Sequence, residues 1–139
     1  MSASEAFFDT NVLAFLTDEE GDRARRTEDL LAGGGVISVQ VLNEFASIAR
    51  RKLGLNWVQT REFLDTFRAT LTVVPLTVET HERGLDLAER YILSIYDGMI
   101  VAAAQLSGCT VLYSEDMHDG LVIDRLTIRN PYKPSAAGR

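Results

Sequence analysis

Short apolar segments alternate with longer amphipathic segments along this 139-residue chain, and this alternation constrains the fold more than any other feature. The short segments are predicted strands, because a run of two to four mostly apolar residues is too short for a helix and suits a buried strand. They cover residues 6–8, 36–37, 71–74 and 110–113, with two further candidates at 121–123 and 126–128. Strands that alternate with helices predict an α/β fold in which a central parallel sheet carries helices on both faces.

The segments between the strands carry helix signals. Ser38 is a suitable N-cap for a long helix that stops near Gly54. Asn56 and Gln59 have the spacing of a capping box and open the next helix. Further helices are predicted over residues 12–16, 22–32, 77–90 and 99–106. The last of these is apolar on every side, which indicates a buried helix.

The composition is that of one globular domain, with 46% hydrophobic and 24% charged residues. A chain of this length is close to the size of one domain, about 150 residues. We expect residues 1–132 to form that domain and residues 133–139 to be a flexible tail. No segment predicts a membrane span, and the N-terminus lacks the basic region of a signal peptide. We therefore expect no membrane association and a cytoplasmic location, with which the single cysteine, Cys109, is compatible.

Charge is distributed unevenly. The net charge of −6 argues weakly against nucleic-acid binding. Residues 23–68, however, contain eight basic and five acidic residues, so this segment is +3 and the remainder is −9. An acidic protein with one basic region can bind a polyanion there, although a solvated helical surface would give the same pattern.

Four carboxylates occupy positions that predict a common site. Asp9 and Asp116 follow two predicted strands, and open parallel sheets bind ligands outside the carboxyl ends of their strands. Glu44 lies on the apolar stripe of a helix, where a carboxylate is rarely buried unless it is paired. Asp97 precedes the apolar helix, whose N-terminus would lie at the same edge, and the alternative is an ordinary N-cap aspartate. Each residue alone also fits an ordinary turn, cap or exposed helical position.

Taken together, the four carboxylates would repel one another unless a divalent cation neutralised them. Mg²⁺ and Mn²⁺ prefer carboxylate oxygens and water, whereas a chain with two histidines and one cysteine is poorly suited to zinc. Carboxylate clusters that hold one or two such ions carry out phosphoryl chemistry. The pattern therefore predicts a magnesium or manganese site.

Four motifs in this chain resemble those of PIN-domain nucleases. They cover residues 7–13 around Asp9, 43–45 around Glu44, 96–104 around Asp97 and 113–120 around Asp116. Their order and spacing are similar to those of the small stand-alone VapC toxins of bacterial toxin–antitoxin pairs, and the resemblance covers about residues 5–132. Gly98 is a small departure, because alanine is more common there in the family.

The resemblance implies a PIN-like three-layer α/β/α fold and a Mg²⁺- or Mn²⁺-dependent endoribonuclease that cleaves RNA by attack of metal-activated water. The residues implied as catalytic and metal-binding are Asp9, Glu44, Asp97 and Asp116, and the supporting residues are Asn11, Ser114 and Asp119. The resemblance also implies an RNA substrate, a cognate VapB-type antitoxin and a homodimer. Arg50, Arg51 and Lys52 of the basic region are the predicted RNA contacts.

Three other interpretations compete with this one. A metal-dependent phosphatase of the haloacid-dehalogenase type needs an aspartate two positions after Asp9, where this chain has Asn11. A response-regulator receiver domain needs a lysine near the site, and neither Lys52 nor Lys133 fits. A PIN fold kept as a non-catalytic interaction module would be expected to lose its carboxylates, and all four are present.

Overall fold

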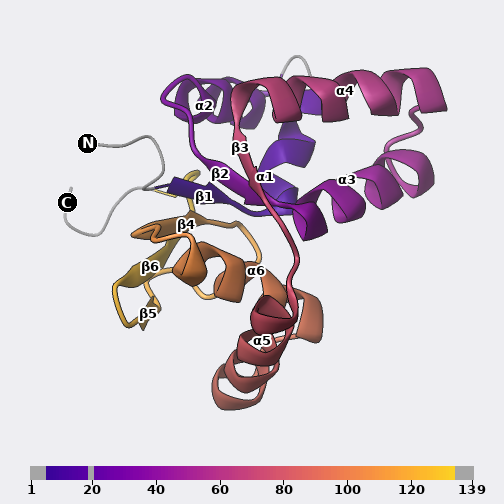
Figure 1. The fold of residues 1–139 in the computed structure, drawn as a ribbon. Helices are drawn as coiled ribbons and strands as arrows, with labels where there is room; N and C mark the ends of the chain where they lie inside the picture. Colours follow the sequence, from indigo (N-terminus) through magenta and orange to yellow (C-terminus); the bar gives the residue numbers. More distant parts are fainter. Residues whose placement is uncertain (1–5, 19–20, 134–139) are drawn as a thin grey trace.

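The computed structural model describes residues 6–18 and 21–133 and follows the predicted alternation of strands and helices (Figure 1). In chain order the elements are β1 (Ala6–Phe8), α1 (Thr10–Ala14), a 3-10 helix η2 (Phe15–Thr17), α2 (Asp22–Leu31), β2 (Val36–Ser38), α3 (Val39–Arg51), α4 (Trp57–Thr70), β3 (Thr72–Val74), α5 (Val78–Tyr91), α6 (Ile95–Leu106), β4 (Val111–Tyr113), β5 (Val122–Ile123) and β6 (Leu126–Arg129). The predicted tail lies outside the described residues from residue 134 onwards. None of the helices described is both long enough and apolar enough to cross a membrane.

The sheet has the strand order β3-β2-β1-β4-β6-β5. The pairs β1–β2, β1–β4, β2–β3 and β4–β6 are parallel, as the alternation predicts. Strand β5 is the exception, because it pairs antiparallel with β6. Only Asp124 and Arg125 connect these two strands, and so short a link permits a hairpin but not the crossover that parallel pairing requires.

The helices form two layers, one on each face of the sheet. The chain steps from β1 to β2 and then to β3 in one direction, and right-handed crossovers place α1, α2, α3 and α4 on the same face. It then returns across the sheet to β4, which places α5 and α6 on the opposite face. In Figure 1, α5 and α6 lie in the lower half of the molecule, whereas α1, α2, α3 and α4 lie in the upper half. The predicted three-layer α/β/α fold is confirmed.

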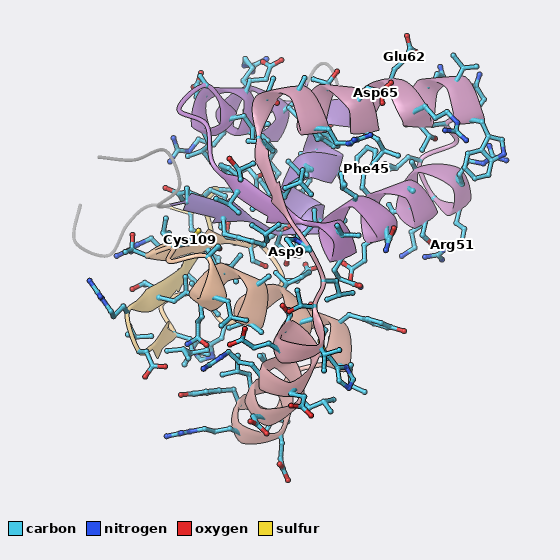
Figure 2. All side chains as sticks on the ribbon, viewed as in Figure 1. Asp9, Phe45, Arg51, Glu62, Asp65 and Cys109 are labelled. Atoms are coloured by element: carbon cyan, nitrogen blue, oxygen red, sulfur yellow. The ribbon has the colours of Figure 1, made fainter. Side chains whose placement is uncertain are left out.

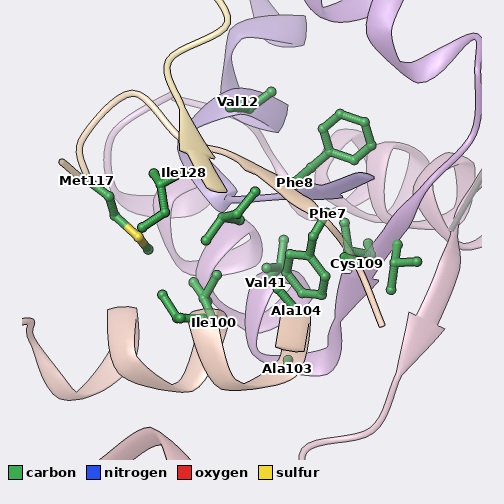
Figure 3. Close-up of a cluster of buried hydrophobic side chains, with 14 of the residues drawn as sticks. Phe7, Phe8, Val12, Val41, Ile100, Ala103, Ala104, Cys109, Met117 and Ile128 are labelled. Carbon is green, nitrogen blue, oxygen red and sulfur yellow. The ribbon is translucent and has the colours of Figure 1, made fainter. Parts of the chain in front are cut away.

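The core lies between the sheet and these helices. Phe7 and Phe8 of β1 are fully buried, and Figure 3 shows them among side chains from α1, α3 and α6. Residues 98–104 of α6 are all buried, in agreement with the apolar character that predicted a buried helix. Cys109, just before β4, is 3% exposed and belongs to the same core. This central packing holds β1 and β4 side by side and so fixes the positions of the loops that follow them.

Close packing of α5 against α6 explains why residue 98 is glycine. A Cβ atom on Gly98 would lie 2.4 Å from the carbonyl oxygen of Gly84 and 3.1 Å from the Cβ of Ala88. The backbone of α5 therefore occupies the space that an alanine side chain would need. The close approach of α5 and α6 therefore explains why this chain has glycine at position 98, where the resemblance would lead one to expect alanine.

Substitution Gly98→Ala should lower the free energy of unfolding by about 1–3 kcal/mol, the usual cost of overpacking a tight interior. A suitable control is Gly33→Ala, because a Cβ on Gly33 has its nearest neighbour, the carbonyl oxygen of Leu30, at 3.6 Å. We expect the control to be close to neutral. Urea unfolding midpoints measure both effects, and equal midpoints for the two variants would contradict the explanation.

Candidate active site

The site lies at the point where the strand order of the sheet reverses. Strands β2 and β4 flank β1 on its two sides, and β2 follows β1 in sequence whereas β4 comes much later. Open α/β sheets bind ligands at such a switch point, outside the carboxyl ends of the strands. Asp9 directly follows β1 and Ser114 directly follows β4, so both residues emerge at this edge.

Asp9 is 3% exposed and is held by three hydrogen bonds. Its Oδ2 accepts a hydrogen bond from the Ser114 hydroxyl at 2.7 Å and another from the Asn11 side-chain amide at 3.2 Å. Its Oδ1 accepts the backbone N–H of Thr10 at 2.7 Å, which caps α1. Two of the three predicted supporting residues, Asn11 and Ser114, thus contact the same oxygen of Asp9.

A second set of contacts anchors the loop after β4. The side-chain oxygen of Asn11 accepts the backbone N–H of Glu115 at 3.1 Å. The carboxylate of Glu115 forms an ion pair of 2.8 Å with Arg23 of α2. The guanidinium carbon of Arg23 lies 5.1 Å from the ring centroid of Phe15 and 5.4 Å from that of Tyr132. This loop, which carries Asp116, is therefore fixed from two sides. No sequence pattern indicates this role for Arg23.

Glu44 of α3 is half-buried, and both of its oxygens are hydrogen-bonded. Oε1 accepts the hydroxyl of Thr10 at 2.9 Å, and Oε2 accepts the side-chain amide of Gln40 at 2.8 Å. Neither partner was predicted from the sequence. Gln40 lies four residues before Glu44 on the same helix, a spacing at which side chains meet, so its role could have been found. Thr10 belongs to a different segment, and no local pattern links it to Glu44.

The predicted start of α6 was wrong, and the alternative in which Asp97 is its N-cap is excluded. The helix begins four residues earlier than predicted, at Ile95, and its N-cap is Ser94, whose hydroxyl oxygen accepts the backbone N–H of Asp97 at 3.0 Å. Asp97 lies in the first turn and is half-buried. Asp116 is exposed in the loop after β4.

Asp119, the third predicted supporting residue, is exposed and has a structural contact. Its Oδ1 accepts the backbone N–H of Asn130 at 2.7 Å, directly after β6. This hydrogen bond joins the loop after β4 to the end of the neighbouring strand β6. The structure thus gives Asp119 a role in shaping the loop.

The carboxylates influence one another electrostatically. The pKa of Asp9 is raised from 3.8 to about 7. Burial is the largest cause, the charges of Asp97 and Glu44 also raise the pKa, and the hydrogen bonds from Ser114 and Thr10 lower it. Burial also raises the pKa of Asp97, and the charges of Glu44 and Asp116 add to this effect. The four residues therefore lie near enough to repel one another in the absence of a cation.

The carboxylates do not form a closed ligand shell. Among residues 6–18 and 21–133, no group of three or more histidine, cysteine, aspartate or glutamate side chains is gathered closely enough to hold a metal ion. Mg²⁺ does not require such a cage, because it usually keeps several waters and binds through one or two carboxylates plus substrate phosphates. The donors here are carboxylate oxygens, and the negative charges of Asp97 and Glu44 add to the effect of burial in raising the pKa of Asp9. The residues therefore fit a hard divalent cation.

The predicted RNA contacts lie apart from this site. Arg50 and Arg51 occupy the last turn of α3, Lys52 is its C-cap, and all three are exposed. Arg51 lies seven residues beyond Glu44, which is about 10 Å along a helix at 1.5 Å per residue. Figure 2 shows Arg51 at the far end of α3 from Asp9. The structure does not bring these cations to the carboxylates.

Comparison with known proteins identifies the family. The sequence matches the PIN domain over residues 6–118. No curated protein matches the sequence significantly. The fold is similar to a chain of a toxin–antitoxin complex from Klebsiella pneumoniae, with a TM-score of 0.70 and 23% identity over 93% of this chain and 99% of that one.

Two further structures have the same fold. VapC20 of Mycobacterium tuberculosis, described as a sarcin–ricin loop cleaving toxin, has a TM-score of 0.66 and 20% identity over 80% of this chain and 89% of that one. A chain of DNA-bound VapBC from Salmonella typhimurium has a TM-score of 0.68 and 19% identity over 92% of this chain and 98% of that one. At these identities the structures support the fold alone, but the sequence match spans most of the chain. The chain therefore belongs to the PIN domain family.

Proposed function

We propose that this PIN domain is a Mg²⁺- or Mn²⁺-dependent endoribonuclease. The observation that carries the proposal is that four carboxylates from separate parts of the chain meet at one edge of the sheet, where the charges of Asp97 and Glu44 act on the buried Asp9 and those of Glu44 and Asp116 act on Asp97. Carboxylates whose pKa is raised by burial and by neighbouring charges, as for Asp9 and Asp97, are typical of functional sites. A non-catalytic interaction module would have no need of them. The phosphatase alternative is disfavoured because Asn11, two positions after Asp9, is an amide and cannot act as a general acid.

The site residues divide into ligands and residues that orient them. Asp9 and Asp97 would hold the cation, with Glu44 and Asp116 adding ligands or negative charge. When bound, the cation supplies activation of the attacking water and neutralisation of the phosphate charge. Ser114 and Asn11 orient Asp9, and Thr10 and Gln40 orient Glu44. The carboxylates are therefore positioned before RNA arrives, as outer-shell hydrogen bonds generally achieve.

We further propose that the chain is the toxin of a VapBC-type pair that acts in the cytoplasm, with a small VapB-type antitoxin as its partner. The support is the similarity in fold to chains of toxin–antitoxin complexes, including the VapBC complex from Salmonella typhimurium. A homodimer is part of this proposal. It is supported by exposed apolar side chains around the turn between α5 and α6, where Ile92 is 92%, Ile95 55% and Tyr96 63% exposed. Sedimentation of the purified chain measures the oligomeric state.

Mapping of the product ends tests the proposed chemistry. RNA incubated with the protein in Mg²⁺ should give fragments with a 5′-phosphate and a 3′-hydroxyl, because water attacks the phosphorus and the 3′ oxygen leaves. Excess EDTA should abolish cleavage, and an Asp97→Asn preparation purified in parallel controls for contaminating nucleases. Fragments with a 2′,3′-cyclic phosphate would mean that the RNA's own 2′-hydroxyl attacked, and they would contradict the mechanism.

A further inference from the structure

Trp57, the only tryptophan in the chain, is unusually exposed. It is the first residue of α4, and 58% of its surface is accessible, although tryptophan is highly buried on average. Its neighbour Val58 is 68% exposed. The two residues open α4, next to the turn between α3 and α4 on the right of Figure 1.

The indole ring is held by a rigid turn. Gly54 adopts a left-handed conformation with φ of 71°, and Asn56 and Gln59 form both hydrogen bonds of a capping box at the start of α4. The guanidinium carbon of Arg50 lies 4.6 Å from the centroid of the Trp57 ring, and the same guanidinium donates to the carbonyl oxygen of Leu55 at 2.9 Å. A fixed cation thus stacks on the indole, and most of the ring surface still faces solvent.

The segment that contains Trp57 is basic and is flanked by Glu44 and Glu62. Residues 45–61 contain no aspartate or glutamate and carry four cations, so this segment is +4 while the rest of the chain is −10. The four cations are Arg50, Arg51, Lys52 and Arg61, and all are exposed. We call these residues together with Trp57 the Trp57 surface. An exposed aromatic ring that stacks on Arg50 within a basic segment of an acidic protein is complementary to a nucleic acid with accessible bases.

We propose that the Trp57 surface binds single-stranded RNA, with one base stacked on the indole of Trp57 and the adjoining phosphates held by the four cations. Single-strand-binding proteins combine a positive surface with aromatic rings in this way, and Arg adds cation–π attraction. Bases in a duplex are stacked on one another, so a duplex offers only its phosphates. The inference rests on the proposed ribonuclease function. It makes this surface a docking site for the RNA strand that enters the carboxylate site.

The position of Trp57 provides a direct assay, because all tryptophan fluorescence comes from this residue. In EDTA, a 12-nucleotide oligouridylate should quench the fluorescence, and an RNA duplex of the same length should quench it much less. Trp57→Ala should weaken binding of a labelled oligouridylate about 5- to 150-fold, which corresponds to the measured range for one stacked base. Trp57→Phe should recover part of the affinity, and Val58→Ala, an exposed apolar neighbour, should bind like wild type.

Cleavage assays separate this inference from the proposed function. In Mg²⁺, Trp57→Ala should raise KM for single-stranded RNA and leave kcat unchanged, whereas Asp97→Asn should lose cleavage and keep the fluorescence quenching. Equal affinity of Trp57→Ala and wild type, with cleavage intact, would overturn the inference alone. Quenching by oligouridylate without cleavage by any preparation would overturn the proposed function and leave the docking site in place. A changed sedimentation mass of Trp57→Ala with unchanged RNA affinity would make the surface a protein interface and would also overturn the inference.

Discussion

Asp97→Asn should reduce RNA cleavage at least about 100-fold, because removal of a direct metal ligand costs at least as much as the 10- to 100-fold loss that follows removal of an outer-shell partner. The charge of Asp97 acts on Asp9, and Asp97 is in turn affected by Glu44 and Asp116, so this side chain is coupled to all three other carboxylates. Asparagine keeps the shape of the side chain and the backbone hydrogen bond to Ser94. We therefore expect the variant to stay folded. Initial rates of cleavage of a labelled RNA in Mg²⁺ measure the loss.

The matched control is Asp119→Asn. Asp119 lies in the same loop as Asp116 but uses Oδ1 to accept the backbone N–H of Asn130, and an asparagine oxygen can accept the same hydrogen bond. We expect this variant to cleave RNA within a few-fold of wild type. A large loss on Asp119→Asn would assign it the supporting role at the site that the family resemblance implies. Full activity of Asp97→Asn would contradict the proposed site.

Much of the fold could be predicted because its signals are local. The short apolar strand segments, the Ser38 cap and the Asn56 capping box each depend on residues close in sequence, and each is present in the structure. The start of α6 was missed for a local reason as well. Its first turn contains Ile95 and Tyr96, which are exposed, so the apolar run that marks the helix begins only after that turn. Ser94 lies three residues before Asp97, which is the spacing of an N-cap signal. It was missed because the helix was predicted from the apolar run alone.

The candidate site could be predicted only in part. Asp9 and Asp116 follow strands, and strand order brings the ends of parallel strands to one edge, so their placement followed from the alternation. The contact between Thr10 and Glu44 depends instead on how α1 and α3 pack, which no spacing encodes. The ion pair between Arg23 and Glu115 joins segments more than 90 residues apart and has the same origin. Long-range pairs of this kind decide the orientation of the site residues, and they require the folded chain.

The metal-free protein should lose stability as the pH rises from 5 to 8, and Asp9 is the cause. Its pKa is about 7 in the folded protein and about 3.9 in an unfolded chain. Between these values the folded state binds more protons than the unfolded state, so the free energy of unfolding falls with increasing pH. The contribution of Asp9 to the free energy of unfolding is fully present below about pH 4 and is lost as the pH rises through about 7. From pH 5 to pH 8 the expected loss is about 2–3 kcal/mol.

Asp9→Asn isolates this effect, because other titrating groups cancel in the difference between wild type and variant. Urea unfolding in EDTA should show the variant gaining stability relative to wild type by about 2–3 kcal/mol between pH 5 and pH 8. Ser114→Ala should move the midpoint of the wild-type change to higher pH, because the Ser114 hydrogen bond lowers the pKa of Asp9. At pH 8, Mg²⁺ at a hundredfold excess over its Kd should restore about 3 kcal/mol to wild type and little to Asp9→Asn. A constant difference between wild type and Asp9→Asn across this pH range would mean that Asp9 stays ionised in the folded protein, and the electrostatic argument for a cation at this site would fail.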